Sequence, residues 1–201
     1  MIAHQTTPKR PSLRTAAVMD RFGIDFETEP VIIAESFALP DDVRVVAFVG
    51  ESGAGKSTLM RHVAASLDGV VDIDAVEMGD RPLIDRLGGT VDEAIARLGR
   101  CGLAEARLML RLPSELSEGQ RYRFRIAAAL DAEPRWIAAD EFTATLDRTL
   151  AKVVARNVAR TARAQGCGVL LATTHEDVLA DLDADLIVRC RLDEPPELMR
   201  R

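Results

Sequence analysis

Nine consecutive residues in the first third of the chain have the types and spacing of a phosphate-binding loop. Two glycines separated by four residues are followed directly by Lys56 and Ser57, an arrangement typical of such loops. Glycine lets the backbone curl so that successive N–H groups point into one concavity, where the next helix adds a positive dipole end. In this loop Lys56 would reach the β- and γ-phosphates of a nucleotide, and Ser57 would hold Mg²⁺. The candidate residues are Gly50, Glu51, Ser52, Gly53, Ala54, Gly55, Lys56, Ser57 and Thr58.

The residues on either side provide the context that this loop needs. Residues 44–49 form a short apolar run of strand character, and residues 59–67 carry apolar side chains at helical spacing. A strand, a glycine loop and a helix in this order favour a phosphate site over an ordinary glycine-rich turn. We therefore predict that the chain binds a nucleoside triphosphate. No base-reading motif excludes GTP in favour of ATP.

Other polar residues directly follow predicted strands. Asp140 and Glu141 end the apolar run at residues 136–140, and His175 follows the run at residues 169–173. Strands that alternate with helices predict a mostly parallel sheet, whose ligands bind beyond the carboxyl ends of the strands. The phosphate loop, the acid pair and His175 should therefore meet at one edge of the sheet.

The acid pair suits phosphoryl transfer to water. That reaction needs charge neutralised on the phosphate oxygens and a nucleophile held in line. Asp140 would make a second protein contact to Mg²⁺, within reach of Ser57. Glu141, one residue further on, would polarise the attacking water as a general base.

The composition limits the class of protein. The chain has 201 residues, of which 47% are hydrophobic and 29% charged, and its net charge is -6. These values are typical of a soluble globular protein and argue against broad, non-specific binding of nucleic acid. No apolar run approaches the roughly 20 residues that cross a bilayer, so we do not expect a transporter pore. Three scattered cysteines indicate reduced thiols, and we expect a cytoplasmic location.

The chain divides into an arm and one domain. Residues 1–17 carry three basic and no acidic side chains, and we expect a flexible basic arm. Residues 18–201 should form a single α/β domain with a helical insertion at about residues 78–130. Within that insertion Thr90 and Glu93 have the spacing of a capping box and predict a helix start. Ser117 is the expected N-cap of a second helix.

The order of these motifs resembles that of the ABC ATPase superfamily. Residues 116–120 read Leu-Ser-Glu-Gly-Gln and stand where that superfamily has its signature, about 20 residues before the acid pair. Asp147 and His175 fall at its D-loop and H-loop positions, and the resemblance covers roughly residues 31–191. It implies a P-loop NTPase fold of the ABC type, with a mostly parallel sheet, a small antiparallel β portion and a shortened helical subdomain.

The resemblance also implies roles for these residues. The chain would hydrolyse ATP with Mg²⁺, and Lys56, Glu141 and His175 would be catalytic, with His175 contacting the γ-phosphate. The signature would contact the nucleotide of a second copy. The chain would therefore form a head-to-tail dimer when ATP is bound and a monomer when ADP is bound. The residues expected at that seam are Ser117, Gly119, Gln120 and Asp147.

The chain departs from the superfamily pattern at several positions. Glu118 replaces the second glycine of the signature, and Phe142 replaces the proline that often follows the catalytic glutamate. No glutamine lies between the phosphate loop and the signature, and Asp85 is the nearest candidate for the Q-loop position, where its carboxylate would touch Mg²⁺ or its water. Phe22, preferred over Phe26, is the candidate platform for the adenine ring.

The sequence indicates the nucleotide chemistry more clearly than the process that the ATPase drives. The acid pair, the signature stretch and the short helical segment look most like soluble ABC-type ATPases found beside or fused to predicted acetyltransferase-like domains. We therefore expect an ATPase that drives or regulates a soluble partner, and an acetyltransferase-like protein is the candidate. One alternative is the nucleotide-binding subunit of an ABC membrane transporter. Another is a weakly catalytic, nucleotide-dependent dimerisation switch, which Glu118 and the missing glutamine suggest. Whether nucleic acid is bound stays open.

Overall fold

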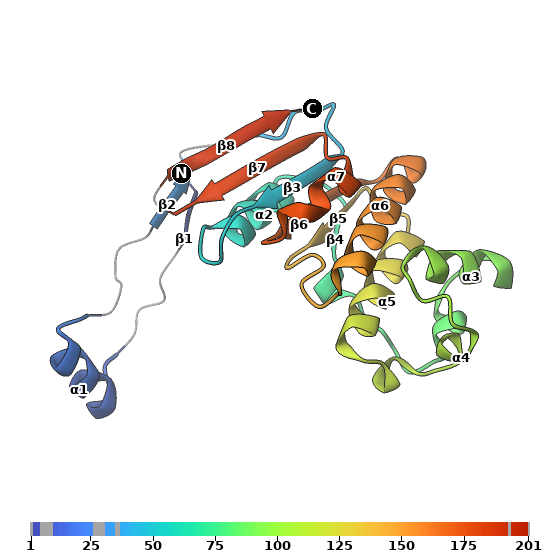
Figure 1. Cartoon of the computed structure of the whole chain (residues 1–201), viewed down its shortest axis with the longest axis horizontal. Helices are drawn as coiled ribbons and strands as arrows, with labels where there is room; N and C mark the ends of the chain where they lie inside the picture. Colours follow the sequence, from blue (N-terminus) through green and yellow to red (C-terminus); the bar gives the residue numbers. More distant parts are fainter. Residues whose placement is uncertain (1, 5–9, 26–30, 35–36, 193, 201) are drawn as a thin grey trace.

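The computed structural model describes residues 2–4, 10–25, 31–34, 37–192 and 194–200 (Figure 1). Among these residues a sheet of six strands forms the centre, in the order β4-β5-β6-β3-β7-β8. Every neighbouring pair is parallel except β7 and β8, which are antiparallel. The strands are β3 Val45–Val49, β4 Val70–Asp72, β5 Trp136–Ala139, β6 Gly168–Thr173, β7 Leu186–Arg191 and β8 Glu194–Arg200.

A second, smaller sheet pairs β1 (Ile2–His4) with β2 (Val31–Ala34) in antiparallel fashion. The predicted α/β fold, with a mostly parallel sheet and a small antiparallel portion, is therefore confirmed. Among the described residues, none of the helices combines the length and the apolar character that a bilayer crossing requires.

Helices cover both faces of the large sheet, whereas the first helix lies apart from it (Figure 1). Short 3-10 turns η1 (Ile73–Ala75), η2 (Leu83–Arg86), η3 (Pro113–Glu115) and η4 (Glu176–Val178) connect several of the elements. The helices are α1 Leu13–Phe22, α2 Lys56–Ala65, α3 Val91–Arg100, α4 Ala106–Met109, α5 Glu118–Asp131, α6 Arg148–Gln165 and α7 Leu179–Leu182.

Each face of the sheet carries its own apolar layer. Side chains alternate along β3, so that Val45 and Val49 belong to one layer and Phe48 to the other. Leu59 of α2 packs in the layer of Phe48, whereas α3, α5 and α6 contribute to the opposite layer. Helices on both faces explain why β3, β5 and β6 read as continuous apolar runs.

Local capping signals in the sequence mark the helix starts correctly. The Thr90 hydroxyl accepts from the Glu93 N–H at 3.3 Å, and the Glu93 carboxylate accepts from the Thr90 N–H at 2.8 Å. The Thr90 N–H and the Thr90 hydroxyl, which donates to the same carboxylate at 3.0 Å, lower the pKa of Glu93. Ser117 caps α5 with Gln120 in the same reciprocal way. Both predicted helix starts are confirmed.

The N-terminal residues differ from the expected arm. Residues 1–17 include β1 and the first part of α1, so the expected boundary at residue 17 falls inside a helix. Ser12 and Thr15 form a capping box at the start of α1, and Gly23 ends it in the left-handed conformation. Figure 1 shows α1 apart from the large sheet, and none of its residues is buried.

Asp185 joins the start of β3 to the end of α6. Its carboxylate accepts from the N–H groups of Arg44 and Val45 at 2.9 and 2.7 Å, and from the Arg163 guanidinium at 2.9 Å. Burial raises the pKa of Asp185, but the hydrogen bonds from Val45, Arg163 and Arg44 outweigh it and lower the pKa. The ionised carboxylate therefore stabilises the fold.

We predict that Asp185→Asn lowers the free energy of unfolding by about 1–2 kcal/mol at pH 7, because charged hydrogen bonds are lost. The difference from the unsubstituted chain should persist down to about pH 4, near the pKa of an unfolded aspartate. It should then shrink as the pH falls through the lower folded pKa. Urea unfolding at pH 7 and below pH 4 measures this difference.

The matched control is Asp42→Asn, since Asp42 pairs with Arg200 on the surface and its side chain is 71% exposed. This substitution should cost under about 1 kcal/mol. Equal effects of the two substitutions at pH 7 would contradict the structural role of Asp185.

Candidate functional site

The phosphate loop packs tightly against the end of β7. Gly50 has φ 143°, and a Cβ added there would lie 2.0 Å from the carbonyl oxygen of Cys190. Gly53 and Gly55 have φ 84° and 83°, in the left-handed region, and Gly55 is the N-cap of α2. Glycine is needed at these positions because a side chain would collide with β7 or strain the turn. The loop therefore keeps the open curl that phosphate binding requires.

Lys56 lies inside this curl. Its ammonium group donates to the carbonyl oxygen of Glu51 at 2.6 Å, and the residue is buried. Burial lowers the pKa of Lys56, while the nearby Cys190, Asp140 and Glu141 act in the opposite direction. The loop is therefore folded over a desolvated cation, the environment in which a phosphate is bound most strongly.

Ser57 meets the acid pair at the carboxyl edge of the sheet. Its hydroxyl donates to Asp140 Oδ1 at 2.7 Å, and the Glu141 N–H donates to the same oxygen at 3.0 Å. A hydroxyl and a carboxylate are the hard oxygen ligands that Mg²⁺ prefers, usually beside substrate phosphates and water. The described residues hold no cluster of three or more His, Cys, Asp or Glu side chains that would bind a metal. Ser57 and Asp140 thus fit a Mg²⁺ that is completed by phosphate oxygens and water.

A sharp turn after β5 separates the two acids from the core. Glu141 and Thr143 have φ 48° and 67°, a left-handed conformation that costs non-glycine residues about 1–2 kcal/mol each. Phe142 between them is fully buried, and its N–H donates to the Ala172 carbonyl at 2.7 Å. This backbone hydrogen bond anchors the turn to β6, while Glu141 is exposed at the edge.

His175 follows β6 beside the phosphate loop. Its N–H donates to the Thr173 hydroxyl at 3.0 Å, and the residue is half-buried. Its neighbours Thr174 and Glu176 line a hollow of about 380 Å³ together with the first two residues of the phosphate loop. The structure therefore brings the segment that carries His175 to the same edge as Gly50.

The signature stretch forms the start of α5. The Ser117 hydroxyl accepts from the Gln120 N–H at 3.3 Å, and the Gln120 side-chain oxygen accepts from the Ser117 N–H at 3.0 Å. A Cβ at Gly119 would lie 3.0 Å from the Thr145 carbonyl, so α5 approaches the D-loop closely. Asp147 ends that loop and caps α6, accepting from the Leu150 N–H at 2.9 Å.

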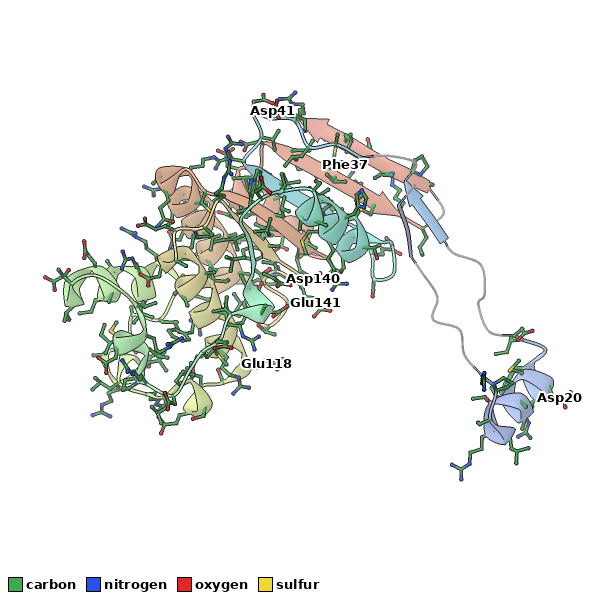
Figure 2. All side chains as sticks on the ribbon, turned by 180° about the vertical axis from the view of Figure 1, so that it is seen from behind. Asp20, Phe37, Asp41, Glu118, Asp140 and Glu141 are labelled. Atoms are coloured by element: carbon green, nitrogen blue, oxygen red, sulfur yellow. The ribbon has the colours of Figure 1, made fainter. Side chains whose placement is uncertain are left out.

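A second hollow of about 460 Å³ joins the acid pair to α5. Figure 2 shows Asp140, Glu141 and Glu118 on the same side of the molecule, and all three line this hollow. Glu118 therefore lies at the site, as its position in the signature suggested. The other lining residues are Arg61, Asp74, Arg121, Tyr122, Arg125, Ala144 and Thr145.

Asp74 is a site residue that the motif comparison did not identify. It follows β4, which pairs parallel with β5 with Asp72 opposite Ala138, so the chain reaches the same edge as Asp140. Asp74 forms an ion pair with Arg125 of α5 at 3.2 Å. The signal was present in the sequence, because residues 70–74 form a strand-like run that ends in an acid, as residues 136–140 do.

The structure does not bring two other candidates to this edge. Asp85 is exposed in η2 and does not line either hollow. Among the described residues, no hydrogen bond joins its side chain to Ser57 or Asp140. Phe22 is the last residue of α1 and is 69% exposed, on a helix that lies apart from the sheet (Figure 1). Phe26 lies outside the described residues.

Proteins of known name resemble this chain, although no protein-family model matches it. The phosphonates import ATP-binding protein PhnC of Hyphomonas neptunium is 32% identical over 191 residues, covering 73% of this chain and 72% of that protein. The lipoprotein-releasing system ATP-binding protein LolD of Gluconobacter oxydans is 28% identical over 221 residues, covering 89% and 93%. A solved dimeric ATP-binding cassette in a post-hydrolysis state, bound to ADP and Pi, has a TM-score of 0.64 at 19% identity and covers 88% and 94%.

We predict that Gly50→Ala weakens binding of a fluorescent ATP analogue at least tenfold. The added methyl group would collide with the Cys190 carbonyl, and the loop would have to move away from β7. Fluorescence titration measures the affinity, and circular dichroism checks that the variant is folded.

The control is Gly99→Ala in α3, where an added Cβ meets nothing within 4 Å. This variant should bind the analogue like the unsubstituted chain. An affinity of Gly50→Ala within threefold of that control would show that the loop does not depend on its contact with β7.

Proposed function

Because the chain belongs to the ABC ATPase superfamily and hydrolyses ATP, we propose that it is the nucleotide-binding subunit of an ABC transporter at the cytoplasmic face of a membrane. The observation that carries the hydrolytic part is the 2.7 Å hydrogen bond between Ser57 and Asp140, with Lys56 and Glu141 beside it. The transporter part is supported by the relatives, which are named for phosphonate import and for lipoprotein release.

The expectation of a soluble partner is wrong. The related proteins are ATP-binding subunits of import and release systems, and the suggested association with an acetyltransferase-like protein finds no support among them. The short helical segment had argued for that expectation, yet relatives of the transporter type align over 89% of this chain.

We propose the following roles for the residues at the edge of the sheet. The loop N–H groups and Lys56 bind the phosphates, and Ser57 and Asp140 hold Mg²⁺, which neutralises charge on the phosphate oxygens. Glu141 is exposed beside Asp140 and accepts a proton from the attacking water. His175 orients that water or the γ-phosphate from the end of the neighbouring strand β6.

The N-terminus of α5 supports a second part of the proposal, association of two copies around ATP. Ser117 is exposed at this helix start, where N–H groups and the helix dipole favour an anion. Asp147 is exposed at the start of α6 nearby. These residues would meet the nucleotide of the second copy, in a dimer like that of the similar solved cassette.

A membrane subunit would also need an apolar surface to contact. In α3, Val91 and Ile95 are 66% and 41% exposed and lie four residues apart on one helix face. Leu110 and Leu112, after α4, are 71% and 37% exposed. Large apolar side chains exposed in one segment favour a protein contact over free solvent.

We predict that Glu141→Gln, held with Mg-ATP, forms dimers and retains a membrane partner. Loss of the general base should lower steady-state hydrolysis at least a hundredfold while leaving nucleotide binding intact, so that the ATP-bound state accumulates. Light scattering measures the dimer, and a pull-down from the native host followed by mass spectrometry identifies the partner.

The control is Lys56→Ala, which should stay monomeric with Mg-ATP and recover no partner in an ATP-dependent way. A membrane-spanning protein recovered with Glu141→Gln supports the transporter role, whereas recovery of soluble proteins alone contradicts it. Slow hydrolysis that Glu141→Gln does not change would instead favour the weakly catalytic switch.

A further inference from the structure

Arg61 of α2 covers the carboxylate of Asp140. Its guanidinium lies 2.8 Å from Asp140 Oδ2, the oxygen that Ser57 and the Glu141 N–H leave free. The Arg61 side chain is 68% exposed, whereas that of Asp140 is 17% exposed. A flexible cation on the surface thus holds a largely buried anion in one orientation.

The other arginines of the same hollow have different partners. Arg125 pairs with Asp74 at 3.2 Å, and Arg121 donates to the Leu116 carbonyl at 2.7 Å. Among the described residues that line this hollow, Arg61 is therefore the cationic side chain that contacts Asp140, the proposed Mg²⁺ ligand. Arg61 lies four residues after Ser57 on α2, so the two side chains share one face of the helix and both reach Asp140.

The hydrogen bonds to Asp140 engage both of its oxygens. Oδ1 accepts from the Ser57 hydroxyl, while Oδ2 is held by Arg61. Without the guanidinium, only Oδ1 would keep the hydrogen bonds that the structure shows, and the carboxylate would be held less firmly in its orientation. A bound guanidinium also offsets the charge of Asp140 and repels a second cation nearby.

We propose that Arg61 is a positioning residue, which orients Asp140 for hydrolysis and suppresses the binding of a divalent cation to the site without nucleotide. Productive metal binding then requires the phosphates, whose negative charge outweighs that of Arg61. This inference rests on the proposed Mg²⁺ role of Ser57 and Asp140, but not on the transporter role.

The test compares Arg61→Gln with two other variants. Arg61→Lys keeps the charge near Asp140, and Arg160→Gln removes an exposed arginine of α6 that does not line either hollow. Binding of Mn²⁺ alone to the nucleotide-free chain is measured from the electron paramagnetic resonance signal of free Mn²⁺. We expect Arg61→Gln to bind Mn²⁺ at least threefold more tightly than the unsubstituted chain, with Arg61→Lys and Arg160→Gln within twofold of it.

Hydrolysis gives the second measurement. We expect Arg61→Gln to lower kcat about tenfold with little change in KM for Mg-ATP, and Arg61→Lys to restore most of it. Binding of an ATP analogue in EDTA should be unchanged, because Lys56 and the loop bind the phosphates. Thermal unfolding of each variant checks that the fold is kept.

Three outcomes would overturn the proposal. The first is that Arg61→Gln binds Mn²⁺ no more tightly than the unsubstituted chain. Failure of this variant to bind Mn²⁺ at millimolar concentration counts as the same outcome. The second is a loss of metal-free nucleotide affinity larger than the change in Mn²⁺ affinity, since Arg61 would then contact phosphate. The third is that Arg61→Lys fails to restore kcat. None of these measurements involves the membrane partner, so their results do not depend on whether the proposed transporter role is correct.

Discussion

The hydrogen bond between the Ser57 hydroxyl and Asp140 joins two segments that lie 83 residues apart in the chain. It is possible only because β5 and β3 run parallel and deliver their following loops to one edge of the sheet. The same edge receives Asp74 after β4 and His175 after β6. Every group proposed for the chemistry therefore depends on strand order and direction. The apolar layers on both faces, which fix that order, are as necessary to the site as the polar residues.

The site is also connected to the helical part of the chain. Asp74 pairs with Arg125 of α5, and Gly119 of α5 approaches the Thr145 carbonyl in the loop that leads to α6. The pair between Arg148 and Asp177, 2.8 Å apart, links the start of α6 to the segment after His175. These contacts of a few ångströms connect the polar edge of the sheet to α5 and α6.

Sequence patterns predicted the features that depend on neighbouring residues. The helix caps at Thr90 and Ser117 depend on a partner only three residues further along the chain, and they were predicted correctly. The mostly parallel sheet was also predicted correctly. Asp74 and Arg61 were missed because their role depends on the pairing of β4 with β5 and on the approach of α2 to β5. β8 was missed because Pro195 and Pro196 argue against a strand, although proline is tolerated on an edge strand. The partner was misjudged because the catalytic motifs do not encode it.

The edge formed by β8 has a consequence for how the molecule associates. Its prolines lack the N–H groups that another strand would need, and Glu194 and Glu197 place charge along the same edge, where both pair with Arg191. Natural sheets use such residues to prevent edge-to-edge pairing and aggregation. Copies of this chain are thereby discouraged from extending the sheet across β8. In the proposed dimer, the two copies would instead meet through helix ends and loops.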